Sequence, residues 1–288
     1  MSPLPTPPRV LLVSAPCLGH INPLVALGPR LASKGLLVTF TTAPHAGLKF
    51  RHHQHDDGVL RFEHLRGGEV WAPDDPRYGL HDDLARHLDD VAPAALAGLI
   101  RRQADAGRPV TFVVANLFAP WALRAAAVVG VPADMLWTQS CTVLSLYYHY
   151  FLSLAALPSK EAGPGAAVVG VPGLPALVAG DLPALIDQVP EEHVWRQILS
   201  SEIRGIRETV SCVLDNTFDE LEHAAIEALR MHLPILPVGP LFDTENDGND
   251  DDEGTAWLDA QPPRSVVFVA FGSVVMPSRD EMAEVAAC

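Results

Sequence analysis

Positive charge is scarce in this chain of 288 residues, in which 20 lysines and arginines stand against 35 aspartates and glutamates and give a formal net charge of −15. A nucleic-acid-binding surface has to neutralise phosphates, so this balance argues against a nucleic-acid partner. Seven of the acidic residues lie in one run at 243–253. The rest of the chain carries about −8, which is ordinary for a soluble protein of this size.

Cysteines and long apolar runs are also scarce. The four cysteines, at positions 17, 141, 212 and 288, are widely separated and form no CxxC pair, so we expect neither a disulfide framework nor a zinc site. No apolar run reaches the roughly 18 residues that a membrane-spanning helix needs, and the N-terminus lacks a signal-peptide pattern. We therefore expect a reduced protein without a membrane span, located in the cytoplasm.

Several motifs that would assign a chemistry directly are absent. The chain has no GxGxxG loop, no Walker A loop and no GxSxG elbow, so dinucleotide binding, P-loop chemistry and a hydrolase triad have no support. His52, His53 and His55 stand close together before Asp56 and Asp57, but their spacing matches no standard metal site. A solvated loop is the favoured interpretation of this segment, and we expect neither a metal nor a cofactor.

Short aliphatic or β-branched runs alternate with longer amphipathic segments along most of the chain. The runs predict strands at 9–15, 36–42, 59–62, 110–115, 133–137, 210–214 and 235–238. Helices are expected from Pro23 to about residue 34, and at 80–106, 120–129, 140–155, 191–208 and 219–230. This alternation predicts an α/β fold, a doubly wound domain with a mainly parallel sheet.

The same pattern suggests three parts of the chain. Residues 1–240 are expected to form one complete domain, and 241–264, with the acidic run, a linker. Within 265–288 another buried-strand pattern precedes a helix that begins near Ser278. We interpret this last part as the first strand and helix of a second α/β domain. The Gly- and Pro-rich segment 159–181 reads as a surface excursion.

Gly19 and His20 follow the first predicted strand, where open parallel sheets bind ligands. Glycine allows close approach of the backbone, a following helix start favours anions, and histidine can act as a base. From position alone, a histidine that only caps a helix is equally plausible. The aromatic residues from Trp137 to Phe151 could likewise line a pocket, but their spacing favours core packing.

Several segments, in this order, resemble the plant family of UDP-sugar-dependent glycosyltransferases with the GT-B fold. They are GHINP at 19–23, DNTFDELE at 215–222, VGPL at 238–241, WLD at 257–259 and SVVFVAFGS at 265–273. Further stretches resemble the branch of this family that makes glucose esters of hydroxycinnamic, gallic and similar acids, which has a limonoid-glucosylating relative. They are ASKGLLVTF at 32–40, DDPR at 74–77, LWTQSC at 136–141, YYHY at 147–150 and VPGLP at 171–175.

The resemblance implies inverting transfer of glucose from UDP-glucose, a co-substrate, to a small acceptor such as an aromatic acid. Separately, we expect the protein to be a monomer. It makes His20 the catalytic histidine and places Asn116 where many members have an aspartate that supports it. The other residues that it implies are Gly19, Thr138 and Ser273 at the donor sugar and diphosphate, and Phe118, Trp137, Gln139 and Tyr147 in the acceptor pocket.

Two departures from the family pattern shape the functional prediction. Asn116 cannot stabilise an imidazolium as a carboxylate would, and a nearby position where another aspartate is common holds Arg124. His20 should then be a weak base, which suits a carboxylic acid, already ionised at neutral pH, better than a phenol. The family's Trp/Gln/His/Gly-rich donor box does not occur before Cys288. We therefore expect a truncated chain that is inactive alone and does not bind UDP-glucose measurably.

Two alternatives remain open. One is a glucosyltransferase that acts on phenol or terpenoid hydroxyls. The other, of a different class, is a catalytically inactive protein that keeps the acceptor pocket and binds small molecules.

Overall fold

The computed structural model describes residues 7–44, 60–66, 70–72, 75–79, 81–158, 162–168, 170–242, 253–269 and 278–287. Seven strands form one sheet in the order β3-β2-β1-β4-β5-β8-β9, and every neighbouring pair is parallel. The strands are β1 (Arg9–Ser14), β2 (Leu37–Thr42), β3 (Leu60–His64), β4 (Phe112–Asn116), β5 (Ala133–Trp137), β8 (Val213–Asp215) and β9 (Ile235–Pro237). All seven predicted strands are present, and the predicted fold class is confirmed.

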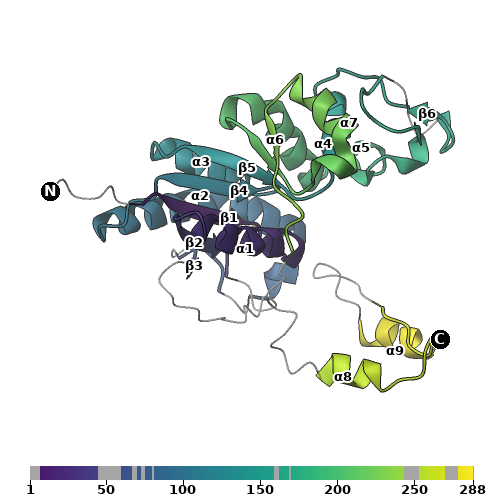
Figure 1. Cartoon of the computed structure of the whole chain (residues 1–288), viewed down its shortest axis with the longest axis horizontal. Helices are drawn as coiled ribbons and strands as arrows, with labels where there is room; N and C mark the ends of the chain where they lie inside the picture. Colours follow the sequence, from purple (N-terminus) through teal and green to yellow (C-terminus); the bar gives the residue numbers. More distant parts are fainter. Residues whose placement is uncertain are drawn as a thin grey trace.

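Helices lie between most of these strands, and two more follow β9 (Figure 1). They are α1 (Leu18–Ala32), α2 (His81–Asp105), α3 (Pro120–Val128), α4 (Cys141–Phe151), α5 (Ala184–Asp187), α6 (Val194–Thr209), α7 (Asp219–Arg230), α8 (Glu253–Asp259) and α9 (Arg279–Ala287), with 3-10 turns at Pro76–Gly79 and Ala179–Asp181. Within the described residues, no helix is both long enough and apolar enough to cross a membrane.

The two faces of the sheet bury separate hydrophobic cores. Val10 and Leu12 of β1 belong to the core beneath α1, whereas Leu11 and Val13 belong to the larger core formed with α2, α3, α4, α6 and α7. Alternate side chains of a strand point to opposite faces, so the continuous apolar run of β1 reflects burial on both sides. Helices on both faces make this a doubly wound domain.

Helix α1 begins earlier than the sequence suggested. It starts at Leu18, so Pro23 lies inside the helix and not at its first position, and His20 lies in its first turn and not in a loop. The chain turns into the helix directly after Cys17, whose carbonyl accepts the N–H groups of His20 and Ile21 at 3.0 and 2.9 Å. Because Pro23 has no N–H, it cannot supply the helical hydrogen bond to the carbonyl of Gly19.

The segment after β9 is fixed against the start of the chain. Arg30 of α1 donates to the carbonyls of Val238 and Pro240 at 3.1 and 2.6 Å. A Cβ on Gly239 would come within 2.7 Å of the backbone of Asn216, which explains why a glycine stands there. The recognised VGPL motif is therefore a packing motif at the end of the sheet.

The C-terminal part differs from its predicted organisation. The described residues of the expected strand at 265–271 do not form it: residues 265–269 form no strand and are exposed, and 270–277 lie outside the described residues. A parallel strand needs neighbours for its backbone hydrogen bonds, and the described part of the chain pairs none with this segment. Helix α8 lies inside the expected linker. The predicted helix near Ser278 is confirmed as α9, and Ser278 and Glu281 cap each other's backbone at its start.

Other predictions fall partly or wholly outside the described residues. These are the His-rich segment at 52–57 and residues 243–252 of the acidic run. Segment 159–181 contains a short antiparallel pair, β6 (Ala167–Val168) with β7 (Leu177–Val178). The division into a domain, a linker and a second domain stays a prediction.

Candidate functional site

Most of the predicted site residues that the structure describes lie at the carboxyl edge of the sheet. Strands β1, β4 and β5 are adjacent there and end at Ser14, Asn116 and Trp137. His20, Phe118 and Thr138 follow these three ends along the chain. Because parallel strands end at a common edge, the topology brings together residues that are about a hundred positions apart in sequence.

His20 is half-buried in the first turn of α1. Burial lowers the pKa of its imidazole to about 4, so the ring is neutral at neutral pH. Its Nδ1 atom is buried and has no hydrogen-bond partner among the described residues. The ring lies edge-on to Phe118, with centroids 5.6 Å apart.

Asn116 supports the backbone around His20 and not its ring. The side chain is only 1% exposed. Its amide donates to the carbonyl of His20 at 2.7 Å and to Oγ of Ser14 at 3.1 Å, and its oxygen accepts the N–H of Ala15 at 3.1 Å. The amide is therefore fully used in holding the turn from β1 into α1, and the imidazole receives no carboxylate partner from this position.

Phe118 links His20 to helix α6. It has a φ of 65°, which is unusual for a bulky residue, and its N–H donates to Oε2 of Glu202 at 3.2 Å. Its ring contacts Trp195 edge-on at 5.1 Å between centroids. Glu202 is buried, and burial raises the pKa of its carboxyl to about 8. His20, Phe118 and Trp195 thus form a row of rings, with the middle one fixed through Glu202.

The residues after β5 divide into buried and accessible ones. Trp137 is completely buried, its Nε1 donates to the carbonyl of Ser140 at 3.1 Å, and it packs edge-on against Tyr147, which is also buried. Both rings belong to the larger core and offer little surface to a ligand. Thr138 is half-buried and Gln139 is exposed.

Gly19 and Ser273 are the other two residues predicted to contact the donor. Gly19 is exposed, and a Cβ there would meet nothing within 4 Å. Close backbone packing therefore does not require a glycine at this position. Ser273 lies outside the described residues.

A half-buried acid holds the start of α4. Glu222 of α7 accepts the N–H groups of Cys141 and Thr142, both at 2.9 Å, and the hydroxyls of Thr142 and Thr217 at 2.8 and 2.7 Å. These bonds keep the pKa of Glu222 below its usual value although burial opposes them. Asp215 lies close by, and burial raises the pKa of its carboxyl to about 7.

Sequence reasoning missed Trp195, Glu202 and the role of Glu222. Trp195 and Glu202 reach residues about 80 positions away and carry no local motif, so only the folded arrangement reveals them. Glu222 stands in the recognised DNTFDELE segment, but nothing in that pattern showed which acid points inward.

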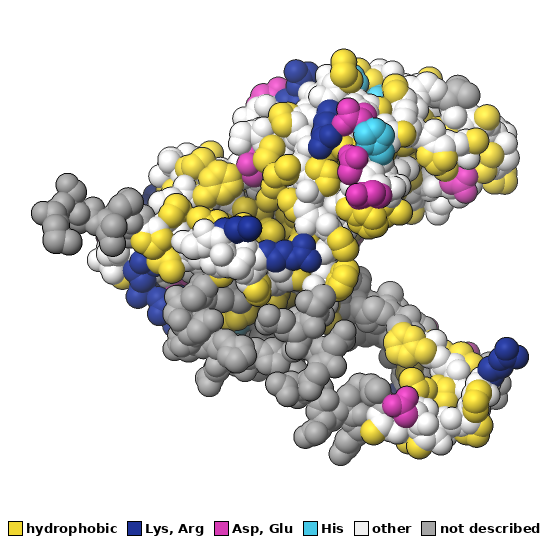
Figure 2. Space-filling model, in the orientation of Figure 1, with side chains coloured by type: hydrophobic (Ala, Val, Ile, Leu, Met, Phe, Trp, Pro, Cys, Tyr) yellow, Lys and Arg dark blue, Asp and Glu magenta, His cyan; other side chains and the backbone are white. Residues whose placement is uncertain are grey.

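Away from the predicted site, three side chains of the kinds that bind metal ions lie close together in the described part of the chain. Asp219, His223 and Glu227 lie on one face of α7, with possible ligand atoms within 4.8 Å of one another. Figure 2 shows acidic, basic and histidine side chains gathered over this exposed helix. His223 already pairs with Asp219 at 2.8 Å, and Glu227 pairs with Arg230 at 2.5 Å. The arrangement is that of a solvated helix face with i,i+3 and i,i+4 pairs.

Curated proteins match nearly the whole chain, although no protein-family model matches it. It is 37% identical over 294 residues to gallate 1-beta-glucosyltransferase 84A23 of Punica granatum, covering 96% of this chain and 57% of that protein. It is also 37% identical to cinnamate beta-D-glucosyltransferase of Fragaria ananassa, covering 96% and 52% of the two proteins. The chain therefore spans little more than half the length of these relatives.

A solved structure agrees with these matches. The crystal structure of Os79 from O. sativa, in complex with U2F and trichothecene, superposes with a TM-score of 0.76 at 27% identity, covering 96% of this chain and 63% of that one. Sequence and fold therefore agree: over 96% of its length the chain is similar to plant UDP-glycosyltransferases of the GT-B fold, and it corresponds to somewhat more than half of their length.

Proposed function

We propose that this chain provides the acceptor side of a glucosyltransferase that moves glucose from UDP-glucose to the carboxylate of a small aromatic acid. The named relatives act on gallate and cinnamate, which are both aromatic acids, and Os79 also has a crystal structure with UDP. The observation that carries the proposal is the environment of His20. Its imidazole is neutral, and its buried Nδ1 atom has no carboxylate partner in the described part of the chain.

The chemistry of a carboxylate acceptor fits such a histidine. An aromatic acid has a pKa of about 4 to 5 and is ionised at neutral pH, so no proton has to be removed. Its oxygen forms the new bond to the anomeric carbon, the bond from that carbon to the diphosphate oxygen breaks, and UDP leaves with the electron pair. Positioning of the two reactants can then supply much of the rate. His20 and Phe118 are the residues that we assign to this positioning.

With a phenol acceptor, the same histidine would have to act as a base. The pKa of a phenol is about 10, so His20 would have to accept a proton in the transition state. Burial without a carboxylate partner disfavours the imidazolium that would result. The alternative activity on phenol or terpenoid hydroxyls is therefore the less favoured one.

The remaining assignments belong to the same proposal. Gly19, Thr138 and Ser273 would meet the donor, and Gln139 and Phe118 would meet the acceptor, with Trp137 and Tyr147 packed behind them. The cytoplasmic location and the monomeric state stay predictions.

One acceptor with both functional groups tests the proposal. 4-Hydroxycinnamate offers a carboxylate and a phenol, and a glucose ester is cleaved by mild alkali whereas a phenolic glucoside is not. We expect the longest natural protein that contains this chain to form the alkali-labile product from UDP-glucose. An alkali-stable glucoside as the main product would support the phenol alternative. Acceptor binding without any transfer would support a non-catalytic binding protein.

A further inference from the structure

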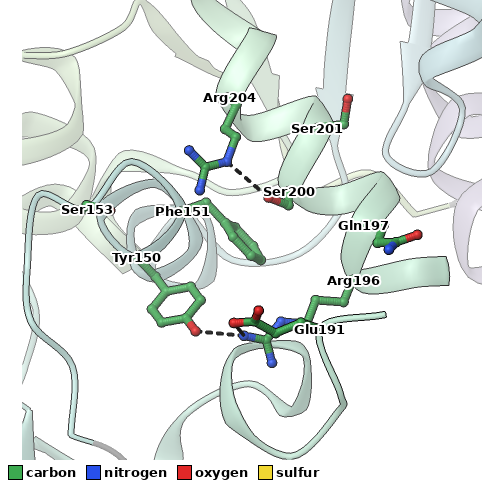
Figure 3. A pocket seen from close by; sticks show the side chains of 9 residues that line it. All are labelled: Tyr150, Phe151, Ser153, Glu191, Arg196, Gln197, Ser200, Ser201 and Arg204. Carbon is green, nitrogen blue, oxygen red and sulfur yellow. Dashed lines mark hydrogen bonds and ion pairs between the residues drawn. The ribbon is translucent and has the colours of Figure 1, made fainter. Parts of the chain in front are cut away.

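A pocket lies between the end of α4 and one face of α6. It has a volume of about 660 Å³, within the range of small-molecule sites. Its walls come from residues 150–153 and from Glu191 with one face of α6 (Figure 3). None of the residues predicted for catalysis, donor binding or acceptor binding lines it.

Arg204 supplies an available cation to this pocket. Its Nε donates to Oγ of Ser200 at 3.2 Å, one helical turn away, which orients the guanidinium group. No carboxylate pairs with Arg204 among the residues that the structure describes. Figure 3 shows its two terminal nitrogens directed from α6 toward the space beside Phe151. A guanidinium held in this way can donate N–H groups to both oxygens of a carboxylate.

Arg196 supplies a second, more rigid cation at the opposite side. It is only 8% exposed and donates to the carbonyl of Val189 at 2.6 Å and to the hydroxyl of Tyr150 at 2.7 Å. The acid that lines the pocket, Glu191, approaches it at 3.6 Å, but its side chain is 86% exposed. Two arginines and one glutamate line the pocket, so it keeps a positive balance in a chain whose net charge is −15.

The wall of the pocket on the side of α4 contains aromatic side chains. Tyr150, which is half-buried, and the accessible edge of Phe151, whose side chain is otherwise buried, form this wall, and the hydroxyl groups of Tyr150 and Ser200 are nearby. One guanidinium without a carboxylate matches a single negative charge better than a diphosphate, and an aromatic wall favours a planar ring. The chemistry of the pocket therefore matches a small molecule with one carboxylate and one ring.

We propose that the α4–α6 pocket is a second binding site for a small aromatic carboxylate, in which the carboxylate pairs with Arg204 and the ring lies against the α4 wall. This site is separate from the place beside His20 where the proposed acceptor reacts.

Fluorine NMR with 4-fluorocinnamate as the probe tests this proposal on the intact 288-residue chain. We expect two bound signals. Arg204→Gln should weaken one of them roughly tenfold or more, because it removes a charge-assisted pair. Arg207→Gln changes an exposed arginine on the same helix that does not line the pocket, and it should leave both signals unchanged. The neutral analogue 4-fluorocinnamyl alcohol should give no Arg204-dependent signal.

The outcomes separate this site from the proposed acceptor site. His20→Ala should weaken the other signal and leave the Arg204-dependent one in place. If Arg204→Gln binds the probe as Arg207→Gln does, the second site is refuted and the acceptor site is unaffected. If the Arg204-dependent signal is the sole one, the proposed function loses its support and the second site stands. Displacement of the probe by an equal concentration of inorganic phosphate would overturn the aromatic part of the proposal.

Discussion

The junction between β1 and α1 and the loop after β5 lie at the same edge of the sheet. Their buried polar groups differ in how completely they are hydrogen-bonded. After β5, three donors converge on the carboxylate of Glu222, and the hydroxyl of Thr217, after β8, is a fourth. After β1, Asn116 satisfies the backbone, while the buried Nδ1 of His20 finds no partner in the described part of the chain.

From this difference we infer that the junction after β5 has a structural role and that the junction after β1 has a role in binding or chemistry. A buried donor or acceptor without a partner costs free energy, and such a group persists where binding or chemistry uses it. The junction after β5 should therefore matter for folding and the junction after β1 for ligands. Four substitutions test this division, and they follow in order of their expected effect on stability.

Glu222→Ala should cause the largest loss. It leaves two backbone N–H groups at the start of α4 and two hydroxyls without their acceptor, and we expect a cost of about 3 kcal/mol. Urea unfolding followed by circular dichroism measures it. Glu227→Ala, on the exposed face of the same helix, is the matched control and should cost less than about 0.5 kcal/mol. Equal losses in the two variants would refute the structural role of Glu222.

Asp215→Asn should change how stability depends on pH. The folded state raises the pKa of Asp215 from 3.8 to about 7, so it holds this proton more tightly than the unfolded chain does. This group therefore stabilises the fold below about pH 4, and that contribution is lost as the pH rises toward 7, by at most about 1.4 kcal/mol per pH unit. The asparagine variant should lack this decline.

Unfolding of both proteins between pH 4 and 8 provides the comparison. His20, whose pKa falls on folding, acts in the opposite direction between about pH 4 and 6.5, but it is the same in both proteins. The difference between the two curves therefore isolates Asp215. Parallel curves would show that Asp215 does not titrate as its burial indicates.

Asn116→Asp should place a carboxylate beside the turn that carries His20. A carboxylate cannot donate to the carbonyl of His20 or to Ser14, so we expect a loss of about 1 to 2 kcal/mol. Its charge should raise the pKa of His20 by about one unit or more, measured by NMR titration of the imidazole. Asn216→Asp adds the same charge but keeps its accepted bond from the N–H of Leu241. An unchanged imidazole pKa in Asn116→Asp would show that position 116 does not control His20.

The same contrast shows which parts of the molecule local sequence could predict. The parallel sheet was predictable because its strands, β1 above all, are apolar runs buried on both faces. The run at 265–269 has the same pattern but forms no strand, since pairing depends on neighbours that the pattern cannot supply. His20 and Asn116 were recognised through motifs. The contacts of Glu202 with Phe118, and of Arg196 with Tyr150, depend on how α6 packs, which no local pattern encodes.

His20→Ala should have the smallest effect on stability and the largest on binding. The imidazole makes no side-chain hydrogen bond through its buried nitrogen within the described residues, so its removal costs mainly the edge contact with Phe118, about 1 kcal/mol or less. Cinnamate binding at the acceptor site should weaken severalfold, as calorimetry would show, while His223→Ala on exposed α7 should change neither property. A His20→Ala protein that loses stability as Glu222→Ala does, yet binds cinnamate normally, would reverse the roles that we assign to the two junctions.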